Sequence, residues 1–375
     1  MTTELSTFLD TVKKPELHIH FRGCLNANLF CNMLLQRRKE DHDQDLLSHL
    51  SQQIREYILS CHRCQAFLAA LAKIPYHVSS LEELKQEDRK YLQQLCRNLW
   101  HYNKPRDFFS TYLLTGALGK QAKHYFPLAD HFASYLKKQN IVYAELIFSV
   151  GEYLDMGMSI DEIKILLAYI HNQVQAVGSQ VYYIFDLVRN FPIDVSIKRL
   201  EMLLEHNIDH FVAITLGGDE TIHETGDFKK LFDIAAHAGL SLSCHAGEFA
   251  DHTSVEQAVH ILGAKRIGHG VQAIHSQKTL EILKDQSITV EVCPTSNQHT
   301  GIWKNIQTHP ARTFFEMGIP ISFASDDPGL FTTSLHQELS IAHTVLGFSI
   351  EELKTTLDYG FQSTFQKHTI SRETI

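Results

Sequence analysis

Short apolar runs alternate with longer amphipathic stretches from about residue 141 to the end of the chain. Runs of this length, rich in β-branched and aromatic residues, are typical of buried strands. Including one early run, the expected strands are residues 16–21, 142–150, 181–188, 210–218, 241–247, 265–270, 288–294 and 320–325. Segments with helical spacing lie between them, for example 254–264, 278–286 and 310–318. Ser159 to Glu162 and Ser349 to Glu352 have the form of helix capping boxes.

This alternation of eight strands with helices predicts an α/β fold, a (β/α)8 TIM barrel. The segment from about 24 to 140 interrupts the alternation and is too long for a structureless loop. We therefore expect a largely helical insertion after the first strand that helps to cover the barrel mouth. No repeat or Pro/Gly-rich linker divides residues 1–375, so we predict one domain. A doubly wound sheet is less favoured because no G-x-G-x-x-G follows the first strand.

Composition and charge narrow the class of partner. The chain has 34 basic and 43 acidic residues, a net charge of -9, which disfavours a nucleic-acid binder and favours a small solute. We see no signal peptide and no membrane span, so we expect a cytoplasmic protein without a membrane partner. Seven scattered cysteines, an odd number, favour reduced thiols over a disulfide framework.

Polar side chains that suit a metal site follow four of the expected strands. They are His18 and His20, His245 and Glu248, His269, and Asp326 with Asp327. Residues i and i+2 of a strand point to one face, so the first two imidazoles can reach one ion. Any one of these groups could lie in a solvated turn that caps the next helix. That interpretation is weak for all four groups together, and the set favours a mononuclear hydrolytic metal site. Neutral imidazoles and carboxylates are ligands that suit zinc.

Six motifs occur in an order that is typical of one enzyme family. ELHIHFRG, LGGDE, CHAGE, RIGHG, EVCPTSN and SDDP lie between about residues 14 and 345. In this set the chain resembles the adenosine and adenylate deaminases of the amidohydrolase superfamily. The resemblance implies a hydrolase of purine metabolism whose single zinc ion activates water.

The resemblance also implies a role for each motif residue. It assigns one Zn²⁺ per chain to His18, His20, His245 and Asp326, with His20 also beside the substrate. Glu248 is then the proton donor to the purine ring, and His269 positions and helps to activate the water. Asp327 and the backbone of Gly218 are expected to bind the purine, and Asp327 is expected to be catalytic together with Glu248 and His269. Two alternatives stay open: His269 as a core histidine in a Gly-rich turn, and Gly218 as a turn residue only.

Elementary chemistry is consistent with these roles. Zinc lowers the pKa of bound water from about 16 toward 7. Attack on an aromatic carbon places negative charge on the ring, so a carboxylic acid that protonates a ring nitrogen stabilises the intermediate. Phe108 and Phe109 have the spacing of core aromatics on a helix, and we leave them out of the predicted site.

Two positions depart from the family pattern. Arg22 stands where adenosine deaminases commonly carry an Asp that binds the ribose 5'-hydroxyl. Its charged, planar guanidinium suits a carboxylate or phosphate. Arg22 therefore either binds an anionic 5' extension of the substrate or pairs with a carboxylate of the insertion. Thr215 replaces an acidic residue three positions before Gly218, which changes the hydrogen bonds around the site.

The predicted function is zinc-dependent hydrolytic deamination of an adenine nucleoside. Adenosine (and deoxyadenosine), converted to inosine and ammonia, is the first expectation, and the partner is this small purine nucleoside. One alternative is a 5'-modified anionic substrate, aminodeoxyfutalosine-like or AMP-like, recognised through Arg22. An alternative of a different class is a nucleoside-binding protein without turnover. The sequence assigns no oligomeric state.

Overall fold

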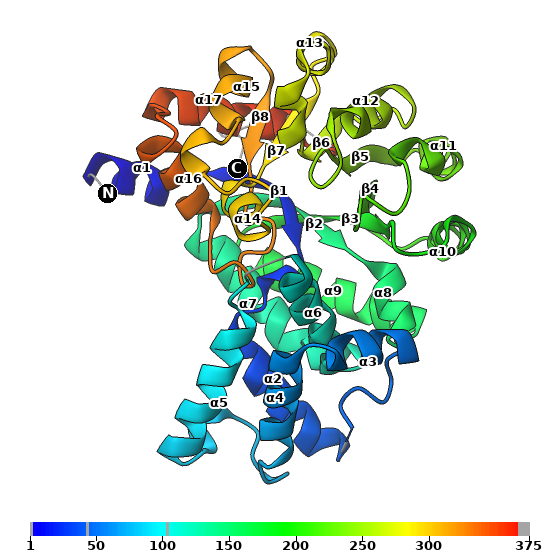
Figure 1. Cartoon of the computed structure of the whole chain (residues 1–375), viewed down its shortest axis with the longest axis vertical. Coiled ribbons are helices and arrows are strands. Elements are labelled where there is room, and N and C mark those ends of the chain that lie inside the picture. Colours follow the sequence, from blue (N-terminus) through cyan, green and yellow to red (C-terminus); the bar gives the residue numbers. More distant parts are fainter. Residues whose placement is uncertain (1–2, 43–44, 103–104, 367–375) are drawn as a thin grey trace.

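The computed structural model describes residues 3–42, 45–102 and 105–366 and contains one sheet of eight parallel strands. Each strand pairs with its neighbour in the chain, in the order β1 to β8. The strands are β1 Lys14–His20, β2 Ile141–Phe148, β3 Gln180–Val188, β4 Phe211–Gly217, β5 Ser241–Ala246, β6 Arg266–His269, β7 Thr289–Val292 and β8 Ile321–Phe323. All eight expected strands are present, and helices surround them (Figure 1). The prediction of a (β/α)8 barrel is confirmed.

The sheet nearly closes through a short contact just beyond the end of β8. Ile19 of β1 forms a parallel bridge with Asp326. The His20 N–H donates to the Asp326 carbonyl at 2.9 Å, and the Asp326 N–H donates to the His18 carbonyl at 3.0 Å. Closure of the barrel therefore brings the DDP segment beside the two histidines of β1.

Helices connect the strands and cover the outside of the barrel. The helices from β2 onward are α8 Val150–Asp155, α9 Ile160–Ala176, α10 Ile193–Glu205, α11 Lys229–His237, α12 His252–His260, α13 Gln277–Asp285, α14 Pro294–His299, α15 Ala311–Glu316, α16 Leu335–Thr344 and α17 Ile350–Gln362. The expected capping box of Ser349 and Glu352 is complete. The other expected box is half formed. Ser159 accepts from the Glu162 N–H, but the Glu162 carboxylate accepts from the Ala122 N–H instead.

The segment between β1 and β2 is helical, as expected for an insertion. It contains η1 Arg22–Cys24, α2 Ala27–Asp41, α3 Gln52–Leu59, α4 His62–Ala72, α5 Gln86–Leu99, α6 Pro105–Leu114 and α7 Phe126–Lys138. Helices α2, α4 and α5 extend away from the barrel, whereas α7 lies against it (Figure 1). One continuous cluster of buried apolar side chains links the insertion to the barrel. Helix α1, Thr3–Thr11, precedes β1.

Among the described segments, no helix has both the length and the apolar character that a membrane span requires.

Candidate active site

Two strand ends that meet at the barrel closure supply three of the predicted metal ligands. His18 is fully buried, and the His20 side chain is 13 % exposed. Asp326 Oδ1 lies 3.5 Å from His18 Nε2 and 3.3 Å from His20 Nε2. The i, i+2 spacing on β1 thus directs both rings toward one carboxylate. Asp326 has φ of +59°, a conformation that costs energy for a residue with a Cβ.

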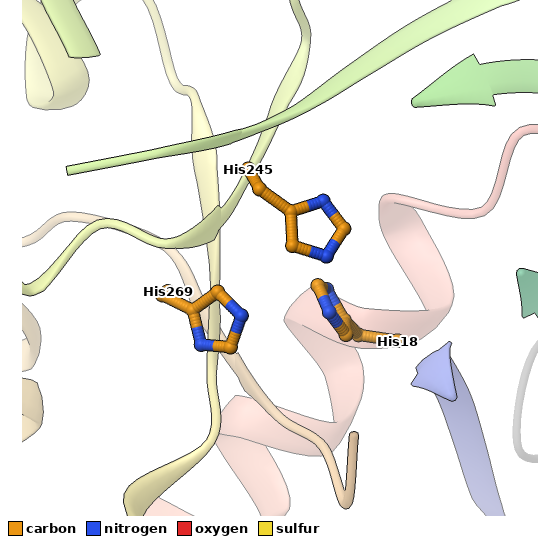
Figure 2. Close-up of side chains that lie close together, drawn as sticks. All are labelled: His18, His245 and His269. Atoms are coloured by element: carbon orange, nitrogen blue, oxygen red, sulfur yellow. The ribbon is translucent and has the colours of Figure 1, made fainter. Parts of the chain in front are cut away.

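The neighbouring strands β5 and β6 bring two further imidazoles to the same point. The ring centres of His245 and His269 lie 4.5 Å and 5.0 Å from that of His18 (Figure 2). His245 Nε2 is 3.4 Å from His20 Nε2. A Cβ at Gly268 would lie 2.7 Å from His18 Cε1, so the glycine of RIGHG makes room for that ring. The predicted ligands therefore converge, with His269 beside them.

Each buried imidazole is held from behind by a polar partner. His18 Nδ1 hydrogen-bonds Glu291 Oε2 at 2.7 Å, and His245 Nδ1 lies 3.2 Å from Thr215 Oγ1. His269 Nδ1 lies 3.1 Å from the Asn297 amide nitrogen. Partners of this kind fix ring orientation and direct the other nitrogen of each ring toward an ion.

A buried ion-pair network anchors the partner of His18. Glu291 pairs with Arg266 Nε at 2.6 Å, and Arg266 also pairs with Glu145 at 2.6 Å. Phe365 covers the Arg266 guanidinium at 3.7 Å from its ring centre. Since breaking such a buried pair leaves an uncompensated charge, this network resists reorientation of Glu291 and hence of His18.

The donor set fits a divalent cation. His18 Nε2 is buried and has no hydrogen-bond partner within the described residues. Burial opposes the charge on His18, but the nearby carboxylates of Asp326 and Glu291 outweigh it and raise the pKa of His18 to about 10. Burial lowers the pKa of His20 to about 4 and that of His269 to about 3. The carboxylates therefore favour positive charge at His18, whereas the His20 and His269 rings are neutral and can act as metal ligands.

Two sets of ligand atoms in the described residues lie within 4.8 Å of one another: His18, His245 and His269, and His18, Cys293 and Asp326. Cys293 was not predicted. Burial, reinforced by Asp326, raises the pKa of its thiol, which disfavours the thiolate that binds metal. His269 lies farther from Asp326, at 3.9 Å, and faces Glu248 Oε2 at 3.7 Å. The His269 Nε2 atom is thus close to both Asp326 and Glu248.

Glu248 lies on a turn after β5 that is held by another carboxylate. Glu220 accepts the backbone N–H groups of residues 247, 248, 249 and 250 at 2.6–3.0 Å, and also the Ser254 hydroxyl. Arg189 lies 3.8 Å from Glu220 and donates to the His245 carbonyl. Burial, followed by the charges of Asp326 and Glu220, raises the pKa of Glu248 well above its usual range. This shift favours the protonated carboxyl, which is the form that can donate a proton.

Asp327 and Gly218 border the same space. Asp327 is 4 % exposed, and its Oδ1 has no hydrogen-bond partner within the described segments. Burial, together with the charge of Asp326, raises the pKa of Asp327. Gly218 has φ of +91°, and a Cβ there would lie 2.6 Å from Asn190 Oδ1. The turn itself therefore requires glycine, and its backbone also borders the cavity.

These groups line a cavity of about 540 Å³ at the carboxyl ends of the strands. Its walls include His20, Arg22, Gly218, His245, Glu248, His269, Asp326, Asp327, Phe108, Phe109, Tyr112, Glu152, Asp186, Phe249 and Phe331. Phe108 and Phe109, left out of the predicted site, thus border it. The insertion supplies this aromatic side of the cavity, as expected for a segment that covers the mouth.

Arg22 is enclosed by protein groups. It forms an ion pair with Glu152, and its guanidinium lies over the Tyr112 ring at 4.4 Å. The Tyr112 hydroxyl donates to Glu152 at 3.2 Å. The second of the two open interpretations therefore agrees better with the structure, with one correction. The carboxylate partner comes from α8, which follows β2, and not from the insertion.

The sequence reasoning missed several polar residues that hold the site in place: Glu220, Arg189, Glu291, Asn297 and Glu152. The first, third and fourth stand within motifs that had been recognised, LGGDE and EVCPTSN, but received no role. Their position at the carboxyl ends of strands was the available signal. Nothing in the local sequence marked Glu152, since its importance depends on the proximity of Arg22.

Comparisons with known proteins agree with the motifs. Residues 80–375 match the family model described as adenosine deaminase. An adenosine deaminase of Shewanella loihica is 41 % identical over 177 residues, 47 % of this chain and 53 % of that protein. The match thus spans about half the length of this relative. An adenine deaminase of Rhizobium meliloti is 31 % identical over 259 residues, 68 % of this chain and 80 % of that protein.

Solved structures with low sequence identity share the fold. An adenine deaminase from Arthrobacter aurescens superposes with a TM-score of 0.77 at 19 % identity, covering 95 % of each chain. An amidohydrolase from Burkholderia ambifaria with bound Zn gives 0.72 at 18 % identity, covering 97 % of this chain and 89 % of that chain. The N6-methyl-AMP deaminase of Arabidopsis thaliana gives 0.71 at 18 % identity, covering 96 % and 94 %.

Proposed function

Because the chain belongs to the adenosine deaminase family, we propose that it hydrolyses the 6-amino group of an adenine nucleoside, with adenosine as its first substrate. The observation that carries this proposal is the convergence of four strand ends around His18 Nε2, which receives no hydrogen bond from the described residues and lies 3.5 Å from Asp326, beside a Glu248 carboxyl whose pKa is raised. Deoxyadenosine, which differs only in the sugar, belongs to the same expectation.

We assign the metal to His18, His20, His245 and Asp326, whose ligand atoms lie close together. A zinc ion bound there supplies a Lewis acid that makes water a nucleophile at neutral pH. The zinc-containing amidohydrolase of the same fold supports this choice of metal.

The protein groups supply positioning and a proton. Glu248 holds the proton that a purine ring nitrogen receives as negative charge develops on the ring. His269, close to both Asp326 and Glu248, positions the attacking water. Asp327 and the Gly218 backbone border the purine space, where the unpartnered Asp327 Oδ1 is available to a polar group of the base. Phe108 and Phe109 place apolar surface beside these groups, which lowers the local dielectric constant and strengthens these interactions.

Adenine is a second candidate substrate, because the adenine deaminase of Rhizobium meliloti matches over most of its length. The cavity favours the nucleoside. It continues beyond the purine space to Arg22, Glu152 and Tyr57, which leaves room for a sugar.

A substrate panel with metal-loaded protein tests the proposal. Ultraviolet absorbance and ammonia release are measured for adenosine, deoxyadenosine, adenine and cytidine. Adenosine is expected to be the best substrate and cytidine to be inert. A preference for adenine assigns the second function. Absence of turnover on every adenine compound contradicts the proposal and favours a nucleoside-binding protein without catalysis.

A further inference from the structure

The wall at the outer end of the cavity includes a cation, Arg22, that is already held by protein groups. Arg22 is 3 % exposed. Arg22 Nη2 forms an ion pair with Glu152, Nη1 lies 3.8 Å from the Met156 sulfur, and Nε is buried. The Tyr112 ring covers one face of the guanidinium at 4.4 Å, and the Tyr153 ring lies 5.8 Å away. Two parallel hydrogen bonds to a phosphate or carboxylate need a free edge of the guanidinium, which Arg22 does not offer.

The group presented to the cavity is instead the carboxylate of the pair. The Glu152 side chain is 15 % exposed, compared with 3 % for Arg22. Glu152 accepts from Tyr112 and Arg22 through Oε2. No residue in the described part of the chain donates to its other oxygen, Oε1, which can therefore accept a hydrogen bond from a neutral hydroxyl. A sugar hydroxyl fits this chemistry and an anion does not.

Other charges at this end reinforce the preference. Asp155 and Asp186 also line the cavity, and Arg22 is the single lysine or arginine among its described lining residues. Arg199, which is not a lining residue, pairs with Asp155. Burial raises the pKa of Asp186 to about 6, while hydrogen bonds from the Ser149 hydroxyl and the Gly217 N–H favour its carboxylate form. A phosphate dianion placed here would face like charges in a partly desolvated space.

We propose that the Glu152–Arg22 pair is a specificity filter that admits an adenine compound with a neutral hydroxylated substituent and rejects one with a 5'-phosphate or 5'-carboxylate. The filter rests on the proposed function, since it selects substrates for that same site. The buried arginine holds the Glu152 carboxylate in place, and Tyr112 fixes the orientation of the pair.

The test compares kcat/KM for adenosine and AMP in the zinc-loaded protein and in three variants. The wild type is expected to prefer adenosine by about 100-fold or more, because like charges repel in a partly buried site. Glu152→Gln removes the repelling charge and leaves Arg22 cationic, so the AMP-to-adenosine ratio is expected to rise about tenfold or more. In Arg22→Gln/Glu152→Gln the ratio is expected to rise less, because no cation remains. Glu205→Gln, on the exposed end of α10, is the matched control and is expected to leave the ratio unchanged.

Two further measurements keep the filter testable. If Glu152→Gln fails to fold, the wild-type preference is measured in salt, and it is expected to shrink as NaCl increases from about 50 to 500 mM. Binding of inosine and inosine 5'-monophosphate is measured by calorimetry, which needs no turnover, and only inosine is expected to bind tightly. Equal wild-type efficiency for AMP, or a ratio unchanged in Glu152→Gln, overturns the filter. Lack of turnover on both substrates, with inosine still selected over its phosphate, contradicts the proposed function and leaves the filter standing.

Discussion

The two ends of the cavity are built in different ways. At the inner end, the polar side chains follow barrel strands, and backbone pairing such as the bridge between Ile19 and Asp326 sets their spacing. At the outer end, Arg22 comes from η1, most of the other side chains come from helices α3, α6 and α8, and they are placed by contacts with one another. The first arrangement gives the fixed positions that a reaction requires. The second can change without disturbing the barrel, so we expect the inner end to determine chemistry and the outer end to determine substrate choice.

The largest expected effect comes from removing the proton donor of the inner end. In Glu248→Gln the amide cannot supply a carboxylic proton, so kcat is expected to fall by about 10³-fold or more, near the upper range for acid–base groups. Zinc content, measured by mass spectrometry, is expected to stay at the wild-type level. The exposed Glu281→Gln on α13 is the matched control. A kcat within about tenfold of the wild type would contradict the role of Glu248.

Removing a metal ligand is expected to affect metal content as well as rate. His20→Ala deletes the imidazole 3.3 Å from Asp326, so zinc affinity is expected to fall by about 100-fold or more and activity to fall in parallel. His206→Ala, at an exposed position after α10, controls for loss of a histidine elsewhere. One zinc per chain retained at unchanged affinity would show that His20 is not a ligand.

A smaller effect is expected from the carboxylate that holds the Glu248 turn. Glu220→Gln retains one acceptor oxygen, so some of the four backbone hydrogen bonds are lost and Glu248 is less well placed. We expect kcat to fall by about 10- to 100-fold with KM and zinc content nearly unchanged. Glu224→Gln, exposed in the same loop, is the control. A fall in melting temperature with kcat per folded molecule preserved would indicate a structural role only.

The smallest expected effect is on stability and comes from Glu338, a buried carboxyl that is not among the residues lining the cavity. Glu338 on α16 accepts from the Thr295 N–H and from Thr333, and burial raises its pKa from 4.5 to about 7. The folded state therefore binds this proton more tightly than the unfolded state. The resulting stability is complete below pH 4.5 and is lost as pH rises through about 7.

Glu338→Gln removes that dependence. The melting temperature of the variant minus that of the wild type is therefore expected to be a few degrees more positive at about pH 8.5 than at about pH 5. This change corresponds to about 2 kcal/mol in the free energy of unfolding. Comparing pairs of proteins at each pH cancels the constant cost of the substitution. A difference that is the same at both pH values would mean that Glu338 does not titrate as described.

The barrel and the inner end were predictable because they follow from local patterns. Apolar runs of strand length carry the fold, and the chemistry sits at the ends of those runs, where barrels assemble their sites. The i, i+2 spacing of His18 and His20 even specifies a shared face. These features depend on residues that are close together in the sequence, or on the strand order that a (β/α)8 barrel imposes.

The outer end was not predictable because it depends on contacts between distant segments. Arg22 and Glu152 are 130 residues apart, and the sequence offers many carboxylates as partners for one arginine. Phe108 and Phe109 have the same helical spacing whether they pack in a core or line a cavity. Glu220 was visible in its motif, but its role depends on the turn at 247–250 curving around its carboxylate.

We propose that donors from four strand ends hold one ion that activates water for deamination. Metal-free protein, prepared with a chelator, is titrated with zinc while the initial rate of adenosine deamination is followed. Activity is expected to rise from near zero in proportion to added zinc and to level off at one ion per chain. Full activity in the metal-free protein, or no deamination at full zinc occupancy, would contradict the account.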